Sequence, residues 1–343
     1  MNASEHVHFI GIGGYGMSGI ARVMLEMGFR VSGSDMASRE ITDKLQQSGA
    51  KVFIGHKASN ITGADMIVYS SAIPQDNVEL LAASEIGTLL LHRSDMLAKL
   101  LNEKTGIAIS GAHGKTTTSS MISLVMERCG LDPTYLIGGE MMNMGSNAKA
   151  GNGDYVVAEA DESDRSFLKY QPAIAVVTNI EADHLENYEG SFEHLKDAYQ
   201  QFLNSIKVGG TAVICQDDEY LRLLSKTITS KKITFGIDQD ADYRATNVCL
   251  LNRGVTFDVE HNHSTIGHVR LRVPGKHNVY NALATIVVCH HVGLSVEEIA
   301  DVLKDFYGAK RRFQVLGEKD GMMVIDDYAH HPTEIQATIA AAK

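Results

Sequence analysis

The residues with the clearest chemical potential lie in one glycine-containing segment, Gly111-Ala112-His113-Gly114-Lys115-Thr116-Thr117-Thr118. Its lysine and hydroxyls follow the glycines at the start of an expected helix, where the lysine can reach the β- and γ-phosphates of a nucleotide and a threonine can bind Mg²⁺. The spacing departs from the usual G-x-x-x-x-G-K-[ST], because Ile109 stands where the first glycine would be. The segment therefore predicts a shortened phosphate loop, with Thr116 and Thr117 both open as the Mg²⁺ ligand.

Two acidic segments follow later expected strands. The strand Tyr155–Ala158 ends in EADESD, where Glu159 is the main candidate for a carboxylate ligand of Mg²⁺. The strand Ala173–Val177 ends in TNIEADHLE, and its His184 is a candidate ligand of a second cation, although Mg²⁺ prefers oxygen. The alternatives are a solvated acidic loop for the first segment and a surface or hydrogen-bonding histidine for the second.

A second glycine turn, Gly11-Ile12-Gly13-Gly14-Tyr15-Gly16, opens the chain's first expected strand-to-helix unit. Its backbone N–H groups and the following helix N-terminus can receive a diphosphate, and Asp35 ends the next strand, where a carboxylate commonly accepts from a ribose hydroxyl. Taken alone, this pattern favours a dinucleotide enzyme such as an NAD-dependent oxidoreductase. A tight turn without a ligand is the simpler alternative.

The elements that must position these residues alternate between strands and helices, which is typical of mostly parallel α/β sheets. We expect a Rossmann-like domain over residues 1–97, a central P-loop ATPase-like α/β domain over 98–310, and the start of a third α/β domain over 311–343. In the last region, a strand at Met322–Ile325 is followed by a loop and a helix. One strand and one helix cannot bury a core alone, so we expect the chain to be truncated there.

Composition narrows the class of partner. The 343 residues are 44% hydrophobic and 21% charged, with a formal net charge of −11, which disfavours nucleic acid and anionic membranes as partners. Four scattered cysteines without metal spacing, no signal-like N-terminus and no long apolar run predict a cytoplasmic protein with reduced thiols. A small anionic ligand is the expected partner, and composition does not specify an oligomeric state.

Several motifs in order give the chain a specific resemblance. GAHGKTTT, EADESD, TNIEADHLENY, GKHNVYNAL, RRF and DDYAHHPTE are similar to the Mur ligases of peptidoglycan synthesis, from His6 to about Ile339. The resemblance implies an ATP-dependent ligase that joins L-alanine to the lactyl carboxylate of UDP-N-acetylmuramate through an acyl phosphate, with ATP and two Mg²⁺ ions as cofactors. It also leaves a UDP-sugar-binding fragment without turnover as an alternative.

The resemblance assigns the first glycine turn to the UDP-sugar rather than to a nicotinamide cofactor. The implied UDP-sugar-binding residues are Gly11, Gly13, Gly14, Gly16, Met17, Asp35, Ser70, Ser71, Ala72, His92 and Arg93.

The resemblance assigns the second turn and part of the third domain to ATP. The implied ATP-binding residues are Gly111, His113, Gly114, Lys115, Thr116, Thr117, Asn278, Asn281, Arg312 and Asp327. Lys115, Glu159, His184 and Arg312 are the implied catalytic group. Metal ligands are expected among Thr116, Thr117, Glu159 and His184, and Tyr328 and His330 are expected near the amino acid. Ala112 replaces a threonine that is commoner in this loop, and no lysine could be matched to the carbamoylated lysine of some family members.

Overall fold

The computed structural model describes residues 4–342, and its N-terminal lobe is one five-stranded parallel sheet with the order β3-β2-β1-β4-β5. The strands are β1 (His6–Ile10), β2 (Arg30–Asp35), β3 (Lys51–Ile54), β4 (Met66–Tyr69) and β5 (Leu89–His92). The helices are α1 (Tyr15–Glu26), α2 (Glu40–Gln47), η1 (Ala58–Ile61) and α3 (Val78–Ile86), and α4 (Arg93–Glu103) leads into the next domain. The order is that of the expected Rossmann-like domain.

The central domain is built on a ten-stranded sheet with the order β15-β14-β13-β12-β11-β10-β6-β9-β7-β8. Its strands are β6 (Thr105–Ser110), β7 (Thr134–Met141), β8 (Ser146–Lys149), β9 (Tyr155–Glu159), β10 (Ile174–Val177), β11 (Thr211–Cys215), β12 (Lys231–Gly236), β13 (Tyr243–Leu251), β14 (Gly254–His261) and β15 (Ser264–Leu271). Strands β12 to β7 run parallel, and only the two ends of the sheet are antiparallel. The mostly parallel sheet inferred from the sequence is confirmed.

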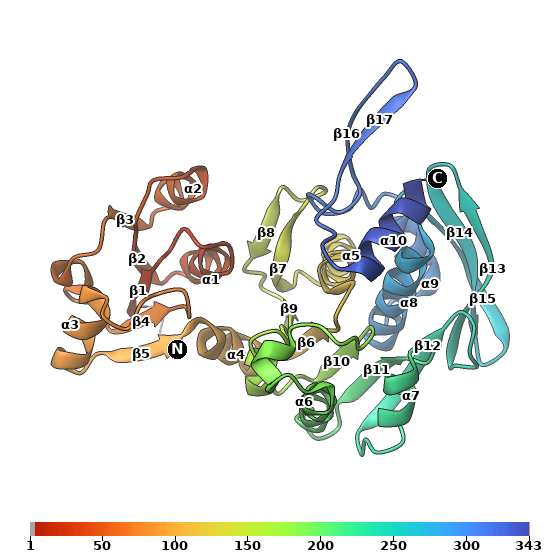
Figure 1. The fold of residues 1–343 in the computed structure, drawn as a ribbon, viewed down its shortest axis with the longest axis horizontal. Helices are drawn as coiled ribbons and strands as arrows, with labels where there is room; N and C mark the ends of the chain where they lie inside the picture. Colours follow the sequence, from red (N-terminus) through yellow and green to blue (C-terminus); the bar gives the residue numbers. More distant parts are fainter. Residues whose placement is uncertain (1–3, 343) are drawn as a thin grey trace.

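Helices cover both faces of this sheet (Figure 1). They are α5 (Lys115–Arg128), η2 (Ser166–Lys169), η3 (Leu185–Tyr188), α6 (Phe192–Asn204), α7 (Glu219–Leu224), α8 (Lys276–His291) and α9 (Val296–Leu303). Helices α5 and α8 pack on each other and are buried along most of their length, since their sequences are apolar or small on nearly every face. The central strands β6, β9, β10 and β11 of the sheet are almost wholly buried. This core fixes the strand ends at which the acidic motifs lie.

The last region contains one strand more than the sequence indicated. Strands β16 (Gln314–Lys319) and β17 (Met322–Asp326) form an antiparallel hairpin that projects from the body, and α10 (Pro332–Ala342) follows (Figure 1). Helix α10 lies against α8 but has no buried residue. The hairpin exposes Val315, Leu316 and Met322, so this region contributes side chains to a site but buries no core of its own.

The β7–β8 hairpin links the three regions of the chain. On one side Arg22 of α1 donates to Ser146 Oγ over 2.9 Å. On the other side, the backbone N–H of Lys310 donates to the carbonyl of Glu140, whose carboxylate also pairs with the Lys310 ammonium at 2.8 Å, and Met141 forms a β-bridge with Ala309. The hairpin therefore holds the segment that leads into the last region.

Within residues 4–342, no helix is long and apolar enough to cross a membrane.

Candidate functional site

The phosphate loop connects β6 to α5, and its shape depends on two glycines. Gly111 has φ 137° and Gly114 has φ 86°, conformations that side chains rarely adopt. A Cβ atom at Gly111 would also lie 2.1 Å from Thr178 Oγ1, and one at Gly114 would lie 2.5 Å from Asn281 Oδ1. Among the described residues no side chain caps α5, so its N-terminal N–H groups face the loop and favour an anion.

Lys115 begins α5 and is held inside the loop. Its Nζ donates to the carbonyl of Gly111 at 2.5 Å and contacts the two carboxylate oxygens of Glu162 at 2.8 and 3.0 Å. Burial raises the pKa of Glu162 although the lysine charge opposes this effect. The ammonium that the sequence assigned to phosphate therefore also contacts an internal carboxylate.

Glu159 ends β9 beside the loop, and both of its carboxylate oxygens accept hydrogen bonds. Oε1 accepts from the N–H of Gly138 at 2.5 Å and from Ser119 Oγ at 3.3 Å, and Oε2 accepts from Thr116 Oγ1 at 3.2 Å. Burial raises the pKa of Glu159 even so, since these contacts and the more distant Lys115 do not fully compensate the carboxylate. Thr116 and Glu159 together offer two oxygen ligands to a hard cation.

A cavity of about 330 Å³ opens between the loop, α8 and the last region. Of the residues expected at ATP, it is lined by His113, Gly114, Thr116, Thr117, Asn278, Asn281, Arg312 and Asp327. Gly111 and Lys115 are not among the residues that line this cavity.

Four of the lining side chains are already engaged. Asn278 donates to the carbonyl of Pro274 at 2.7 Å, and Asn281 donates to Asn278 Oδ1 at 3.1 Å. Arg312 lies 3.6 Å from Glu334, and Asp327 accepts from the N–H of Phe313 at 2.6 Å. These contacts orient the two asparagines and shape the chain turn that faces the cavity.

The third group of expected residues meets near the carboxyl end of β10. His184 has φ 52°, with Nε2 3.7 Å from Asp183 Oδ2, and a ligand atom of His330 lies within 4.8 Å of both side chains. The Tyr328 ring lies 5.4 Å from the His330 ring, and the Arg311 guanidinium lies 4.7 Å from the centre of the tyrosine ring. A predicted metal ligand and both predicted amino-acid neighbours are thus adjacent.

The first glycine turn lies at the carboxyl edge of its own sheet. The N–H groups of Gly11 and Ile12 donate to the carbonyl of Ser34 at 2.8 and 3.0 Å, and the N–H of Gly13 donates to Asp35 Oδ2 at 2.9 Å. Asp35 therefore supports the turn directly. Helix α1 starts after Gly14 without a side-chain cap from any residue that the structure describes.

The other residues expected at the UDP-sugar surround this edge. Ser70, Ser71 and Ala72 follow β4, and His92 ends β5 and caps α4 through Nδ1. Arg93 reaches toward Gly16 and pairs with Asp164 of the central domain at 2.9 Å. Met17 is buried.

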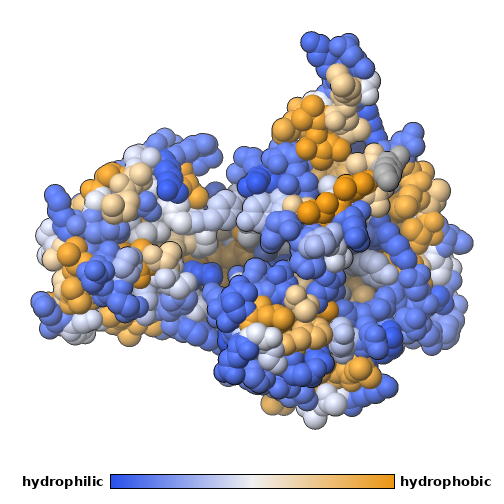
Figure 2. All heavy atoms as spheres, in the orientation of Figure 1, coloured by the Kyte–Doolittle hydropathy of each residue, from blue (hydrophilic) through white to orange (hydrophobic). Residues whose placement is uncertain are grey.

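A cleft beside the turn lies between the N-terminal lobe and the central domain (Figure 2). It has a volume of about 460 Å³ and is lined in part by Gly13, Arg22, Arg39, Lys44 and Lys310. Glu40 and Glu140 also line it and pair with Lys44 and Lys310, each at 2.8 Å. Those four cations were not expected from the sequence.

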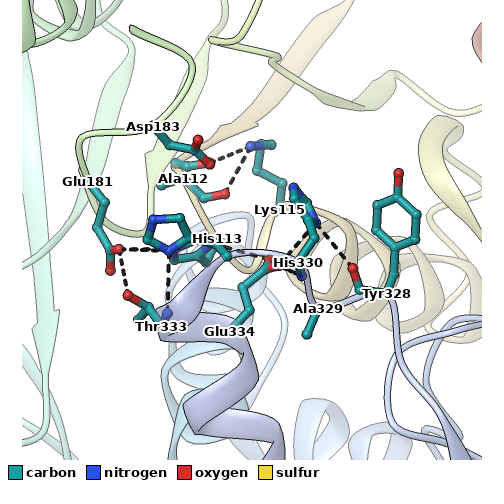
Figure 3. A network of polar contacts seen from close by, with 12 residues as sticks. Ala112, His113, Lys115, Glu181, Asp183, Tyr328, Ala329, His330, Thr333 and Glu334 are labelled. Carbon is teal, nitrogen blue, oxygen red and sulfur yellow. Dashed lines mark hydrogen bonds and ion pairs between the residues drawn. The ribbon is translucent and has the colours of Figure 1, made fainter.

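Sequence reasoning also missed several residues at the phosphate loop. Glu162 lies in the quoted EADESD motif, yet its pairing with Lys115 depends on a loop in which Arg165 has φ 61°. Glu181 and Glu334 both contact His113, at 3.2 Å each (Figure 3). Burial alone would lower the pKa of His113, but the two carboxylates outweigh it and raise that pKa. Glu162, Glu181 and Glu334 all lie in motifs quoted above, but their contacts with Lys115 and His113 become visible only in the folded structure.

A shortened phosphate loop with a buried carboxylate beside it, joined to a Rossmann-type domain with a second glycine turn, defines a class of nucleotide-dependent α/β enzymes. Family models match three consecutive parts of the chain: the Mur ligase family catalytic domain at residues 6–105, the Mur ligase middle domain at 109–289 and the Mur ligase glutamate ligase domain at 311–343. The chain belongs to the Mur ligase family.

Individual relatives agree with this assignment. The chain is 48% identical over 338 residues to the UDP-N-acetylmuramate--L-alanine ligase of Carboxydothermus hydrogenoformans, which covers 98% of this chain and 73% of the relative. It is 50% identical over 342 residues to the enzyme of the same name from Desulforamulus reducens, with 99% and 74% covered. The crystal structure of a UDP-N-acetylmuramate-alanine ligase from Thermotoga maritima superposes with a TM-score of 0.86 at 32% identity and covers 98% of this chain and 77% of that one.

Proposed function

We propose that this chain is an ATP-dependent ligase that joins L-alanine to the lactyl carboxylate of UDP-N-acetylmuramate in peptidoglycan precursor synthesis. The observation that carries the proposal is the convergence of Lys115, Thr116 and Glu159 at one end of α5. The high identity to ligases of this name over nearly the whole chain supports the choice of substrates.

The loop is suited to moving a phosphoryl group between two anions. Such a transfer is mainly a problem of positioning and charge neutralisation. Lys115 supplies one positive charge, and the uncapped end of α5 supplies backbone donors beside it. Phosphorylation of the lactyl carboxylate would give an acyl phosphate, which the amino group of L-alanine attacks with expulsion of phosphate.

Mg²⁺ fits the residues beside the loop. Glu159 is half-buried, burial raises its pKa, and Thr116 and Glu159 are hard oxygen ligands. Bound Mg²⁺ would neutralise the phosphate oxygens. Thr116 suits this role better than Thr117, because only its hydroxyl contacts Glu159. We place a second Mg²⁺ at His184, where Asp183 adds an oxygen ligand.

The substrates are assigned to three places. UDP-N-acetylmuramate would bind the first glycine turn and extend into the adjacent cleft, where Arg22 and Arg39 can meet its negative charges. ATP would occupy the cavity lined by His113 and Asn281. L-alanine would approach Tyr328 and His330. The proposed domains are residues 1–97, 98–310 and 311–343, one for each of these groups of contacts, and Arg312 and Asp327 of the last domain would reach ATP.

A phosphate-release assay tests the proposal. Release from ATP·Mg²⁺ is expected only when UDP-N-acetylmuramate and L-alanine are both present. ATP and the UDP-sugar binding without any release would instead identify a UDP-sugar-binding fragment. Thermal stabilisation by NAD, with none by UDP-N-acetylmuramate or ATP·Mg²⁺, would favour an oxidoreductase and contradict the ligase.

A further inference from the structure

Three side chains from distant parts of the chain meet at the rim of the nucleotide cavity. They are His113 of the phosphate loop, Glu181 from the segment after β10, and His331 immediately before α10, and their ligand atoms all lie within 4.8 Å of one another. They are separate from Thr116 and Glu159, and also from the group that contains His184. Figure 3 shows His113 and Glu181 facing each other beside α10.

The spacing of these atoms matches a small tetrahedral site. Glu181 Oε2 lies 3.2 Å from His113 Nε2 and 3.5 Å from His331 Nδ1. Metal–nitrogen bonds of about 2.0–2.1 Å in tetrahedral zinc sites place neighbouring ligand atoms roughly 3.3–3.4 Å apart. The side chains of His113, Glu181 and His331 are 15%, 30% and 24% exposed, so an ion there would be partly shielded and would keep one open position.

The surroundings of His113 point its second nitrogen at this space. Nδ1 contacts Glu334 Oε1 at 3.2 Å, an arrangement that orients many metal-binding histidines through an outer carboxylate. Nε2 is buried and makes no hydrogen bond within the described chain, because Glu181 is in ion-pair contact with it but not aligned to accept. Glu181 Oε2 in turn accepts from Thr333 Oγ1 at 2.8 Å.

We propose that His113, Glu181 and His331 form a binding site for a borderline divalent cation such as Zn²⁺. Two imidazoles and one carboxylate suit Zn²⁺, whereas Mg²⁺ prefers an oxygen shell, so this site differs in chemistry from the Mg²⁺ sites of the proposed function. Because His331 precedes α10 and His113 lines the nucleotide cavity, the bound ion would fasten the last region onto the phosphate loop and obstruct ATP. The inference concerns a second ligand and does not require the ligase activity.

Binding of Co²⁺, a spectroscopic substitute for Zn²⁺, tests the site without any substrate. The purified chain should develop visible absorption typical of four-coordinate Co²⁺, and equimolar Zn²⁺ should remove it. His331→Ala and Glu181→Gln should each weaken Co²⁺ binding by about 100-fold or more, and Glu334→Gln, which changes only the outer carboxylate, by about tenfold. Zn²⁺ should also reduce the affinity for ATP in the unmodified chain and have little effect in His331→Ala.

One histidine variant serves as a matched control. His268→Ala removes an exposed imidazole on β15 and should leave Co²⁺ affinity unchanged. Absence of the visible band, or equal affinity in His331→Ala, would overturn the proposal. Melting curves verify that the variants fold. If His331→Ala does not fold, Glu181→Gln, which keeps the side-chain shape, provides the decisive comparison.

Discussion

The two glycine turns use the same backbone device but differ in how the buried charge behind them is balanced. Behind the first turn, Glu79 is fully buried and accepts from Ser34 at 2.6 Å and from Asn60 at 2.6 Å, with His8 and His56 beside it. Burial opposes ionisation, but these partners outweigh it and lower the pKa of Glu79 to about 2.

Behind the second turn the balance is the opposite. Glu159 and Glu162 have raised pKa values because burial is the largest effect and their partners compensate it only in part. A carboxylate with a full set of donors stabilises the turn in front of it. A carboxylate that lacks such a set attracts a cation. This contrast is in line with our proposal that the first turn binds the diphosphate of the UDP-sugar and the second brings a metal and phosphate together.

The largest effect expected from this contrast is that of Lys115→Ala. Without the ammonium, no side-chain cation remains in the loop to face the phosphates, and ATP-dependent phosphate release should fall about 1000-fold. The affinity for UDP-N-acetylmuramate, measured by calorimetry, should change less than about twofold, since the first turn is on a separate sheet. Equal losses in both measurements would contradict the separation of the two turns.

Glu79→Gln should act on stability rather than on ATP. Ser34 and Asn60 each donate to one carboxylate oxygen of Glu79, so the NH₂ of a glutamine would face one of these donors. Leaving such a buried polar group without a partner costs about 3 kcal/mol of folding free energy. Denaturant unfolding should show this loss, while ATP affinity of the folded protein stays the same. Glu297→Gln, an exposed change on α9, is the control.

The same carboxylate sets a pH dependence with a defined sign. Because the folded pKa of Glu79 is lowered from 4.5 to about 2, its stabilisation is complete above the ordinary value and is lost as pH falls toward 2. The free energy of unfolding should therefore fall as the pH is lowered from about 5 to about 2, the range over which Glu79 becomes protonated. In Glu79→Gln this slope should be smaller, and an unchanged slope would assign acid sensitivity to other groups.

Gly138→Ala is expected to weaken Mg²⁺ binding beside the second turn. A Cβ atom there would lie 2.7 Å from Glu159 Oε2 and 3.0 Å from Oε1, so the carboxylate must move. Loss of such a supporting contact typically costs 10–100-fold in metal affinity. A Mg²⁺ titration of phosphate release measures it. Gly317→Ala, where a Cβ meets nothing within 4 Å, should titrate like the unmodified chain.

The smallest effect is expected from Gly13→Ala in the first turn. Its Cβ would lie 2.8 Å from Asp35 Oδ2, which would displace the carboxylate that holds the turn. We expect about a tenfold loss of UDP-N-acetylmuramate affinity, because the displaced turn would lose about one hydrogen bond to the ligand. The affinity for ATP should not change. Gly19→Ala in α1 meets only ordinary contacts at 3.4 Å and should have no such effect.

Local patterns predicted the central elements well. The strands expected over Tyr155–Ala158 and Ala173–Val177 are β9, Tyr155–Glu159, and β10, Ile174–Val177. Strand β8 escaped notice because Ser146–Lys149 is short and mostly polar in sequence, although its side chains alternate in burial. Strand β16 escaped notice because Gln314–Lys319 is largely exposed and has no such alternation. Each of these strands is defined by its hydrogen bonds to a neighbouring strand, β7 for β8 and β17 for β16, and this pairing cannot be read from the sequence alone.

The candidate site likewise contains contacts that the sequence could predict and contacts that it could not. Lys115, Thr116 and Glu159 could be placed together because parallel strands end at one edge of a sheet, and in the structure Thr116 contacts Glu159 there while Lys115 contacts Glu162. The meeting of His113 with Glu334 could not, since it joins residues 221 positions apart through the docking of α10. Contacts that depend on a helix of one region lying on another require the packing itself.

Strand β7 has a consequence for anyone who wishes to modify this chain. Gly138 contacts Glu159, and two and three residues later Glu140 and Met141 pair with the segment at Lys310 and Ala309. One inserted residue would turn each side chain to the opposite face of the strand and break all of these contacts together. A fluorescent label or peptide tag therefore belongs at the exposed turn at Asn262, between β14 and β15, and the length of β7 must be left as it is.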